Sequence, residues 1–223
     1  ITLFERFHAV LPDKYKVLLV RQYRMNRTIM GFSSEKFYGG ALVADESVAA
    51  HTLADLKAVR RSAETEEPLV YIDTAGKGFE ERREEGSESR YNPEEAEVVL
   101  AQLRSNLEAG VPPAEIAVIA PYSAQVRLLA SKTPDPAVEI DSVDGFQGRE
   151  KELVIVSLVR SNMLGEMGFL NDTRRMNVAM TRARRKLVVI GDSATLSSLS
   201  FYRDFIAYAE KTGGYKTIWE IEK

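Results

Sequence analysis

The stretch IDSVDGFQGREKE, residues 140–152, directly precedes the apolar run LVIV and has the composition of a loop that contacts a polar ligand. Gly145 and Gly148 permit backbone conformations that other residues avoid, and they let a ligand approach the main chain. Glu150 can accept hydrogen bonds from sugar hydroxyls. Taken alone, the loop also fits a solvated turn with its own ion pair between Arg149 and Glu150, because short motifs often arise by chance.

The composition is that of an ordinary globular protein. The 223-residue chain is 44% hydrophobic and is long enough for one large domain or two small ones. It has no cysteine, and its two histidines, His8 and His51, stand far apart in the sequence, so neither disulfides nor a metal centre is expected. A reducing, intracellular setting, cytoplasmic or nuclear, fits best. No apolar run approaches the length of a membrane span, and the first residues do not resemble an export signal.

Charge is distributed unevenly along the chain. The net charge is −3, which disfavours a protein that coats nucleic acid by bulk electrostatics. Residues 62–97 hold twelve acids and four bases, whereas residues 142–186 hold nine bases and five acids. The positive segment contains the loop at 140–152, where an anionic ligand would be attracted.

Strand and helix patterns alternate along the chain. Apolar runs of strand length occur at residues 17–20, 69–73, 116–119, 153–159 and 187–190, with a short alternating strand at 138–143 and a small final strand at 217–221. Helical patterns occur at residues 2–10 (capped by Thr2), 26–38, 93–107, 171–184 and 196–211, and after Ser123. Because the strands are apolar blocks, the pattern predicts one α/β domain with a parallel sheet and helices on both faces. Residues 80–90 are expected to be a mobile loop.

Polar residues follow several of the expected strands. Tyr23 with Arg24, Thr74, Tyr122 and the residues from Ser142 onward all come after strand ends. Ligands of parallel sheets bind beyond the carboxyl ends of the strands, so these residues are expected to converge on one edge.

Two segments imitate nucleotide-binding motifs without meeting their requirements. Residues 42–46 read LVADE, like the apolar run ending in Asp-Glu that holds magnesium, but the run is short and follows a Gly-Gly turn. Residues 74–78 read TAGKG, and a phosphate loop would need a glycine at Tyr71 and a Ser or Thr at Gly78. Neither segment is therefore expected to bind nucleotide.

The segment NDTRRMNVAMTRAR, residues 171–184, is expected to place two arginines on one helical face. Arg175, Ala179 and Arg182 are spaced i, i+4 and i+7. A solvated basic face is the common explanation of such a pattern. The small residue between the two arginines, however, leaves both guanidinium groups free to hold a phosphate.

The motifs QYRM (residues 22–25), VDGFQGRE (143–150) and NVAMTRAR (177–184) together resemble those of the second RecA-like domain of superfamily 1 helicases. The branch resembled is that of the nonsense-decay and immunoglobulin-mu-binding-protein helicases, which suggests 5′-to-3′ travel. TLFERF at residues 2–7 and APYSAQ at 120–125 are similar to further elements of this group. The resemblance covers nearly the whole chain and implies a RecA-like domain.

The resemblance implies roles for individual residues. Tyr23 would stack on adenine, Arg24 would contact the γ-phosphate of ATP, Glu150 would bind the ribose, and Arg182 would be the arginine finger. Gln147 and Gly148 would couple the nucleotide site to the nucleic-acid site. Residues implied to lie toward a single strand of DNA or RNA are Tyr122, Gln125, Ser142 and Asp144.

The chain departs from the family because it contains no phosphate loop and no magnesium carboxylate. Both belong to the first RecA-like domain, to which residues 1–14 would form the connecting helix. That domain is thus an expected partner, supplying the ligands of Mg²⁺ bound with ATP, and the chain alone is expected to be inactive. The competing hypothesis is a non-catalytic RecA-like module that binds nucleic acid or a protein.

Overall fold

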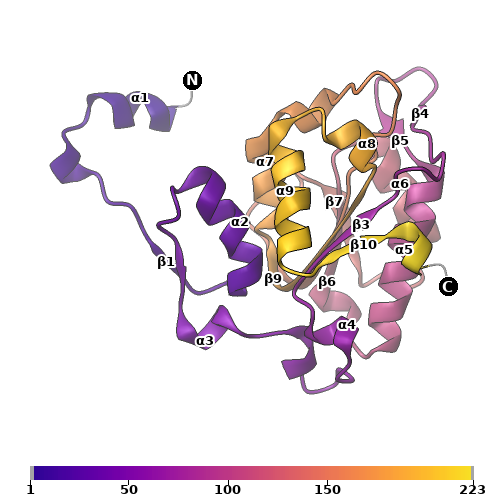
Figure 1. The fold of residues 1–223 in the computed structure, drawn as a ribbon, viewed down its shortest axis with the longest axis horizontal. Helices are drawn as coiled ribbons and strands as arrows, with labels where there is room; N and C mark the ends of the chain where they lie inside the picture. Colours follow the sequence, from indigo (N-terminus) through magenta and orange to yellow (C-terminus); the bar gives the residue numbers. More distant parts are fainter. Residues whose placement is uncertain (1–2, 222–223) are drawn as a thin grey trace.

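The computed structural model describes residues 3–221 and has a six-stranded parallel sheet at its centre (Figure 1). The strand order across the sheet is β10-β3-β9-β8-β6-β7. In that order the strands are Tyr215–Thr217, Leu69–Asp73, Ala183–Gly191, Lys151–Ser157, Ile116–Ala120 and Glu139–Ser142. Two short pairs lie outside this sheet: parallel β1 (Arg21–Gln22) and β2 (Val43–Ala44), and antiparallel β4 (Arg82–Arg83) and β5 (Arg90–Tyr91).

Helices connect the strands. They are α1 (Leu3–Val10), α2 (Arg27–Phe37), α3 (Glu46–Ala49), α4 (Ala63–Glu66), α5 (Pro93–Glu108), α6 (Ser123–Lys132), α7 (Thr173–Met180), α8 (Ser193–Leu196), α9 (Ser200–Lys211) and α10 (Ile218–Ile221). Short 3₁₀ helices cover Asp13–Tyr15, Leu53–Asp55, Pro113–Glu115 and Gly168–Asn171. Among the described residues, every helix is too short or too polar to span a lipid bilayer.

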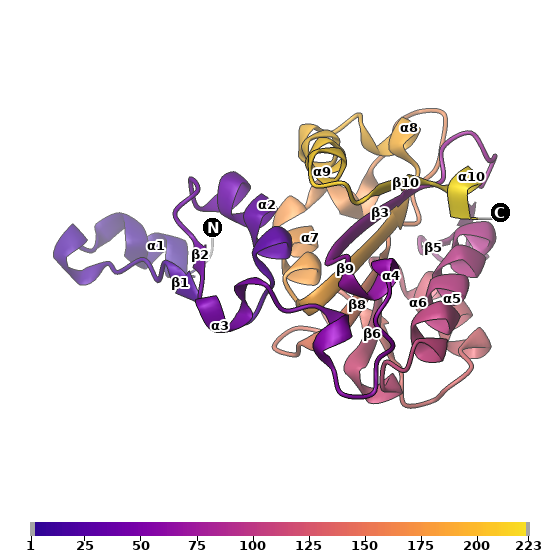
Figure 2. The same ribbon diagram turned by 60° about the horizontal axis from the view of Figure 1, so that its bottom comes forward.

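The sheet separates two apolar cores, and Figure 2 shows helices on both faces of the sheet. Helices α2, α7 and α9 cover one face, where Phe32 and Phe205 pack together in an edge-on arrangement. Helices α5 and α6 cover the other face through Leu103 and Leu129. Since successive strand residues point to opposite faces, each buried strand contributes side chains to both cores. The prediction of a parallel sheet covered on both sides is confirmed.

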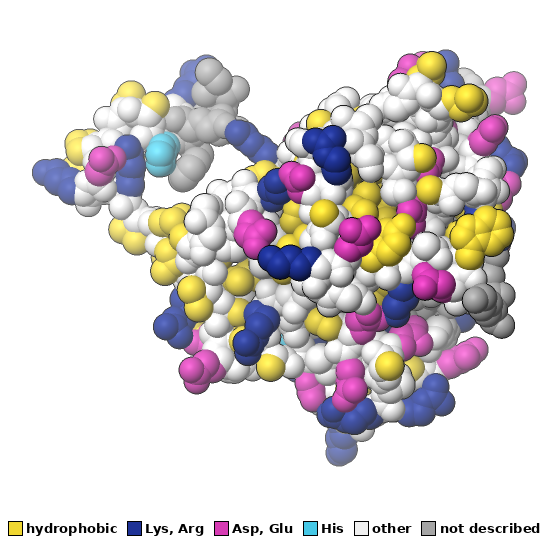
Figure 3. Space-filling view, in the orientation of Figure 1, with side chains coloured by type: hydrophobic (Ala, Val, Ile, Leu, Met, Phe, Trp, Pro, Cys, Tyr) yellow, Lys and Arg dark blue, Asp and Glu magenta, His cyan; other side chains and the backbone are white. Residues whose placement is uncertain are grey.

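The prediction of a buried strand at residues 17–20 is wrong. These residues form no strand, and Val17 and Leu19 are 83% and 80% exposed. They belong to an N-terminal extension, residues 3–20, that projects from the sheet and carries apolar side chains on its surface (Figure 3). Apolarity alone does not create a strand, because the backbone also needs a partner, and here pairing begins only at the end of the run, where the Val20 carbonyl accepts from the Val43 N–H of β2 at 2.7 Å. The predicted helix at 2–10 is present as α1, while its cap at Thr2 lies outside the described residues.

Several element boundaries also differ from the prediction. The helix expected at 171–184 ends at Met180, because β9 begins at Ala183 and hydrogen-bonds on both sides to β3 and β8. Residues 80–90, expected as a loop, include the antiparallel pair of β4 and β5. The predicted helix at 196–211 divides into α8 and α9. The small final strand expected at 217–221 is wrong, because the last strand, β10, ends at Thr217 and the next four residues form α10.

Candidate functional site

Three charged residues that are distant in sequence meet at the amino-terminal edge of the sheet. Arg24 follows β1, Glu150 directly precedes β8, and Arg182 directly precedes β9. Arg24 Nε donates to the Glu150 carboxylate, and Arg24 Nη1 donates to the Thr181 carbonyl at 3.3 Å. Arg184 Nε lies 3.8 Å from the other Glu150 oxygen. We call Arg24, Arg182, Arg184 and Glu150 the arginine cluster.

The turn that carries Arg24 is fixed by Gln22. The Gln22 side-chain oxygen accepts from the backbone N–H groups of Arg24 and Met25 at 2.8 and 2.7 Å, and its amide donates to the Met25 carbonyl at 2.8 Å. Asn26 then caps α2, and its backbone N–H donates to the Arg184 carbonyl at 2.8 Å. These bonds tie the QYRM segment to the start of β9, which explains why Arg24 lies beside Arg182.

Arg182 lies in the turn between α7 and β9 rather than on the helix. Its Nε donates to the Val178 carbonyl at 2.9 Å, and its Nη1 to the Arg149 carbonyl at 3.4 Å. Burial, and then the neighbouring Arg24 guanidinium, lower the pKa of Arg182. An arginine nevertheless stays charged, so two cations lie close together with Glu150 as a nearby counter-ion. A phosphate would offset this repulsion.

The loop at 140–152 does not form the ion pair that a simple solvated turn would have. Arg149 bonds instead with Glu139 and, at 2.7 Å, with Asp141, which leaves Glu150 to Arg24 and Arg184. Gly148 has a φ of 85°, a conformation that favours glycine.

The expected convergence on a single edge is wrong. Strands β7 and β8 both run parallel to β6, so the loop between them must travel back along the sheet. Ser142 ends β7 at the carboxyl-terminal edge, whereas Glu150 precedes β8 at the amino-terminal edge. Gln147 and Gly148, both exposed, lie on this crossing segment. Tyr23, 64% exposed, follows β1 beside the arginine cluster.

The carboxyl-terminal edge holds the remaining candidates. Tyr122 Oη accepts from Arg160 Nη1 and from the Phe169 N–H, both at 3.2 Å. The Ser142 hydroxyl accepts from the Gly145 N–H at 3.1 Å. Asp144 is exposed and lies 3.6 Å from Arg175 Nε in the first turn of α7. Helix α7 therefore joins the two edges, with Arg175 near one end and Arg182 just beyond the other.

Gln125 is fully buried, so in this structure it cannot contact a nucleic-acid strand as expected. Its side-chain oxygen accepts from the Asn92 N–H at 2.9 Å, and its amide donates to Ser157 Oγ at 3.0 Å. Ser157 in turn donates to Glu95 at 2.5 Å. Gln125 therefore fixes α6, and with it Tyr122, against β8.

The sequence motifs missed the residues that support the arginine cluster. Glu152 is buried and ion-pairs with Arg184 at 2.9 Å and with Arg185 at 2.6 Å. The alternation of charges in REKE at the start of β8 and in RARRK at the start of β9 was the available signal, because these strands are neighbours in the sheet. The described residues include no group of three or more His, Cys, Asp or Glu side chains that could hold a metal ion.

Comparison with known proteins agrees with this geometry. A family model described as an AAA domain matches residues 1–194. The DNA-binding protein SMUBP-2 of Rattus norvegicus is 47% identical over 216 residues, covering 94% of this chain and 22% of that protein. The DNA polymerase alpha-associated DNA helicase A of Saccharomyces cerevisiae is 44% identical, covering 87% of this chain and 30% of that protein. An uncharacterized ATP-dependent helicase of Methanocaldococcus jannaschii is 41% identical, covering 94% of this chain and 31% of that protein. The chain thus spans less than a third of these relatives.

Proposed function

Because the chain belongs to the AAA domain family and is the C-terminal RecA-like domain of a superfamily 1 helicase, we propose that the intact protein hydrolyses ATP to move along single-stranded DNA or RNA. The observation that carries this proposal is the arginine cluster. Two guanidinium groups from separate segments, with a carboxylate between them, suit a ligand that has both phosphates and a sugar. A non-catalytic module would not require this combination, and relatives of the chain are named as helicases.

The ion pair between Arg24 and Glu150 has a consequence for nucleotide binding. Arg24 Nε and one Glu150 oxygen are occupied by this bond and are therefore not available to a nucleotide while the pair is closed. Binding would move Arg24 to the γ-phosphate and free Glu150 for the ribose hydroxyls, while Tyr23 stacks on the base. The domain is therefore expected to exchange one internal ion pair for contacts with nucleotide.

Arg182 is proposed to be the arginine finger. Its two hydrogen bonds to carbonyls hold the side chain in place, and the structure assigns no bond to its Nη2 within the described residues. Phosphoryl transfer is catalysed mainly by positioning and charge, so an arginine fixed in this way can stabilise the transition state as the two domains close.

The magnesium ion expected with ATP does not fit the described residues of this chain, which offer no suitable group of ligands. We propose that a first RecA-like domain of the same protein supplies the metal ligands and the phosphate loop. The exposed apolar residues of the N-terminal extension support a partner domain that covers them. The 223-residue chain alone is accordingly expected to turn over no ATP. Its proposed substrates are consistent with an intracellular location.

The single strand is proposed to bind at the carboxyl-terminal edge, near Tyr122, Ser142 and Asp144. Helix α7 and the loop at 140–152 both extend from this edge to the arginine cluster. A change at the nucleotide site or at the nucleic-acid site would therefore reach the other site through α7 and through the loop at 140–152. Opening and closing of the cleft would then move the strand.

The test is single-turnover ATP hydrolysis by the intact protein with saturating single-stranded nucleic acid. Arg182→Ala is expected to lower the rate roughly 10³- to 10⁵-fold, as for other arginine fingers, with little change in nucleotide affinity. Arg182→Lys should restore little, because a point charge does not reproduce the planar guanidinium.

Arg175→Ala is the matched control, because it removes the same charge from the opposite end of α7. It should impair hydrolysis far less. Normal hydrolysis in folded Arg182→Ala protein would refute the assignment of Arg182 as the arginine finger. An equal defect in Arg175→Ala would mean that Arg182 acts only through its positive charge and not through contact with the γ-phosphate.

A further inference from the structure

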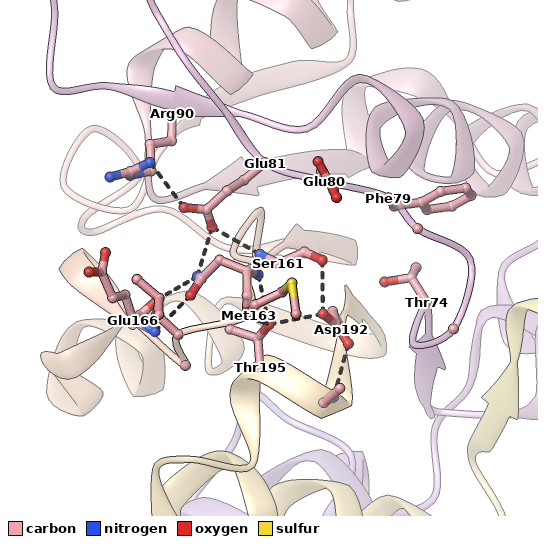
Figure 4. A pocket seen from close by; sticks show the side chains of 16 residues that line it. Thr74, Phe79, Glu80, Glu81, Arg90, Ser161, Met163, Glu166, Asp192 and Thr195 are labelled. Carbon is pink, nitrogen blue, oxygen red and sulfur yellow. Dashed lines mark hydrogen bonds and ion pairs between the residues drawn. The ribbon is translucent and has the colours of Figure 1, made fainter.

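A cavity of about 860 Å³ lies at the carboxyl-terminal edge of the sheet, and no residue of the arginine cluster lines it. Figure 4 shows its walls, which are formed by the loop after β3, the loop after β8 and the start of α8. It is lined by none of the residues proposed above to contact nucleotide or nucleic acid. The cavity therefore requires an explanation of its own.

The walls are held together by hydrogen bonds within the protein. The Glu81 carboxylate lies 2.8 Å from Arg160 Nε and 3.1 Å from Arg90 Nη1, and it accepts from the Ser161 N–H at 2.9 Å. Asp192 accepts from the hydroxyls of Ser161 and Thr195 at 2.8 and 2.9 Å. These bonds connect all three walls, so the cavity has a defined shape before any ligand binds.

The lining is acidic. It contains the carboxylates of Glu80, Glu81, Glu166 and Asp192 and the guanidinium of Arg90, and the buried Arg160 guanidinium behind it lies 3.6 Å from Glu166. Glu81 is offset by its two arginines, while Glu80 is exposed and has no ion pair with any described residue. Such a lining attracts a cation and repels the phosphates of a nucleic acid.

Thr74 provides independent evidence for a ligand. Its side chain is 2% exposed, and its hydroxyl oxygen is buried with no hydrogen-bond partner. Figure 4 shows this hydroxyl pointing from the end of β3 into the cavity. Buried hydroxyl groups almost always have a partner, so a hydrogen-bonding group from outside the chain is expected here.

Two apolar side chains on the loop after β8 lie beside this acidic cavity. Met163 and Leu164 are fully and 82% exposed, and both belong to its lining. Adjacent large apolar side chains in water are typical of a surface that another protein covers. A small inorganic cation would use the carboxylates but would leave these side chains exposed.

We infer that the cavity binds a basic peptide segment of a partner protein. One Lys or Arg side chain enters beside Glu80 and donates to Thr74 Oγ1, while Glu166, on the opposite wall of the cavity, adds to the attraction of a cation. An apolar neighbour on the same peptide packs against Met163 and Leu164. This binding uses neither ATP nor the arginine cluster, so it stands independently of the proposed helicase activity.

The probe for this site is a fluorescein-labelled hexapeptide of alternating arginine and leucine, titrated into the 223-residue chain and followed by fluorescence anisotropy. The same peptide with citrulline for arginine keeps the shape without the charge and should bind at least fivefold more weakly. The variant Glu80→Gln/Glu166→Gln should weaken the arginine peptide at least fivefold. Leu164→Ser should weaken both peptides.

The matched control is Glu85→Gln/Glu88→Gln, which removes the same charge from the exposed segment between β4 and β5, outside the cavity lining. It should change affinity less than twofold. Amide NMR signals of Thr74 and Ser161 should shift on peptide addition, and melting curves should confirm that each variant folds. Absence of peptide binding, an equal loss in the control pair, or the same NMR shifts with a single-stranded oligonucleotide would overturn the proposal.

Discussion

Glu95 is a fully buried carboxyl group beneath the carboxyl-terminal edge of the sheet. It accepts from Ser157 Oγ at 2.5 Å and from the Val159 N–H at 2.9 Å, and its other oxygen has no partner. Val159 has a φ of 71°, which is unusual for a β-branched residue. Glu95 thus holds a strained turn that begins the wall of the acidic cavity. It also belongs to the network that fixes Gln125.

Burial raises the pKa of Glu95 from 4.5 to about 7, against the lowering effect of its hydrogen bonds. Between these pH values the folded protein keeps a proton that the unfolded chain has lost. The free energy of unfolding should therefore fall as pH rises from 4.5 to 7, by roughly 3 kcal/mol from this group. Glu95→Gln should remove that dependence.

Urea denaturation at pH 5, 6, 7 and 8 measures the effect. The wild-type and Glu95→Gln pH profiles of the free energy of unfolding should differ in slope by nearly one proton between pH 5 and 6, by about half a proton at pH 7 and by almost none at pH 8. Glu108→Gln, an exposed change on the same helix, should leave the slope unaltered. Parallel pH profiles for wild type and Glu95→Gln would contradict the assignment.

Single residues were predictable from the sequence where their neighbours in the chain determine their position. Arg24 and Glu150 are brought together by long-range bonds, because the Asn26 N–H donates to the Arg184 carbonyl and so ties the QYRM segment to β9. The resemblance implied that both bind nucleotide, but not that they bond to each other. Gln125 shows the opposite case, because an amide near a loop looks accessible in a sequence and is buried here by α5 and β8.

At the scale of elements, apolar runs identified the sheet strands but not the strand partners. The runs that became β3, β6, β8 and β9 each lie between other strands or beneath helices. The run at 17–20 is equally apolar and has no such place in this chain. The expectation that the site residues converge on one edge of the sheet failed for a related reason. The direction of the long loop at 140–152 depends on which strands pair.

Substitution can show that the apolar run at residues 17–20 is exposed whereas the run in β3 is buried. Val17→Asp/Leu19→Asp should change the free energy of unfolding of this chain by less than about 0.5 kcal/mol per site, because both side chains are exposed. The matched change Val70→Asp in β3, where the side chain is buried, should prevent folding or destabilise by several kcal/mol. Thermal melting of the purified variants provides the comparison. A large loss in the first variant would show that residues 17–20 are buried after all.

At the scale of the whole molecule, negative and positive regions occupy different sites. The acidic lining of the cavity and the basic arginine cluster lie at opposite edges of one sheet, with net charge −3 overall. The nucleic-acid candidates Tyr122, Ser142 and Asp144 share an edge with the acidic cavity. This arrangement restricts a nucleic-acid strand to the part of that edge near Arg175.

Single-strand binding by this chain should therefore be weak and depend on few phosphate contacts. Each contact contributes a slope of about −0.7 to the logarithm of affinity against the logarithm of salt concentration, so two or three contacts predict roughly −1.4 to −2. Arg175→Gln should reduce the magnitude of this slope by about 0.7. Arg182→Gln should leave it unchanged, because Arg182 lies at the opposite edge of the sheet. Anisotropy titrations of a labelled oligonucleotide at several salt concentrations measure all three slopes. Equal effects of the two substitutions would mean that the strand does not distinguish the edges, and a slope near zero would mean that base stacking rather than phosphate contact holds it.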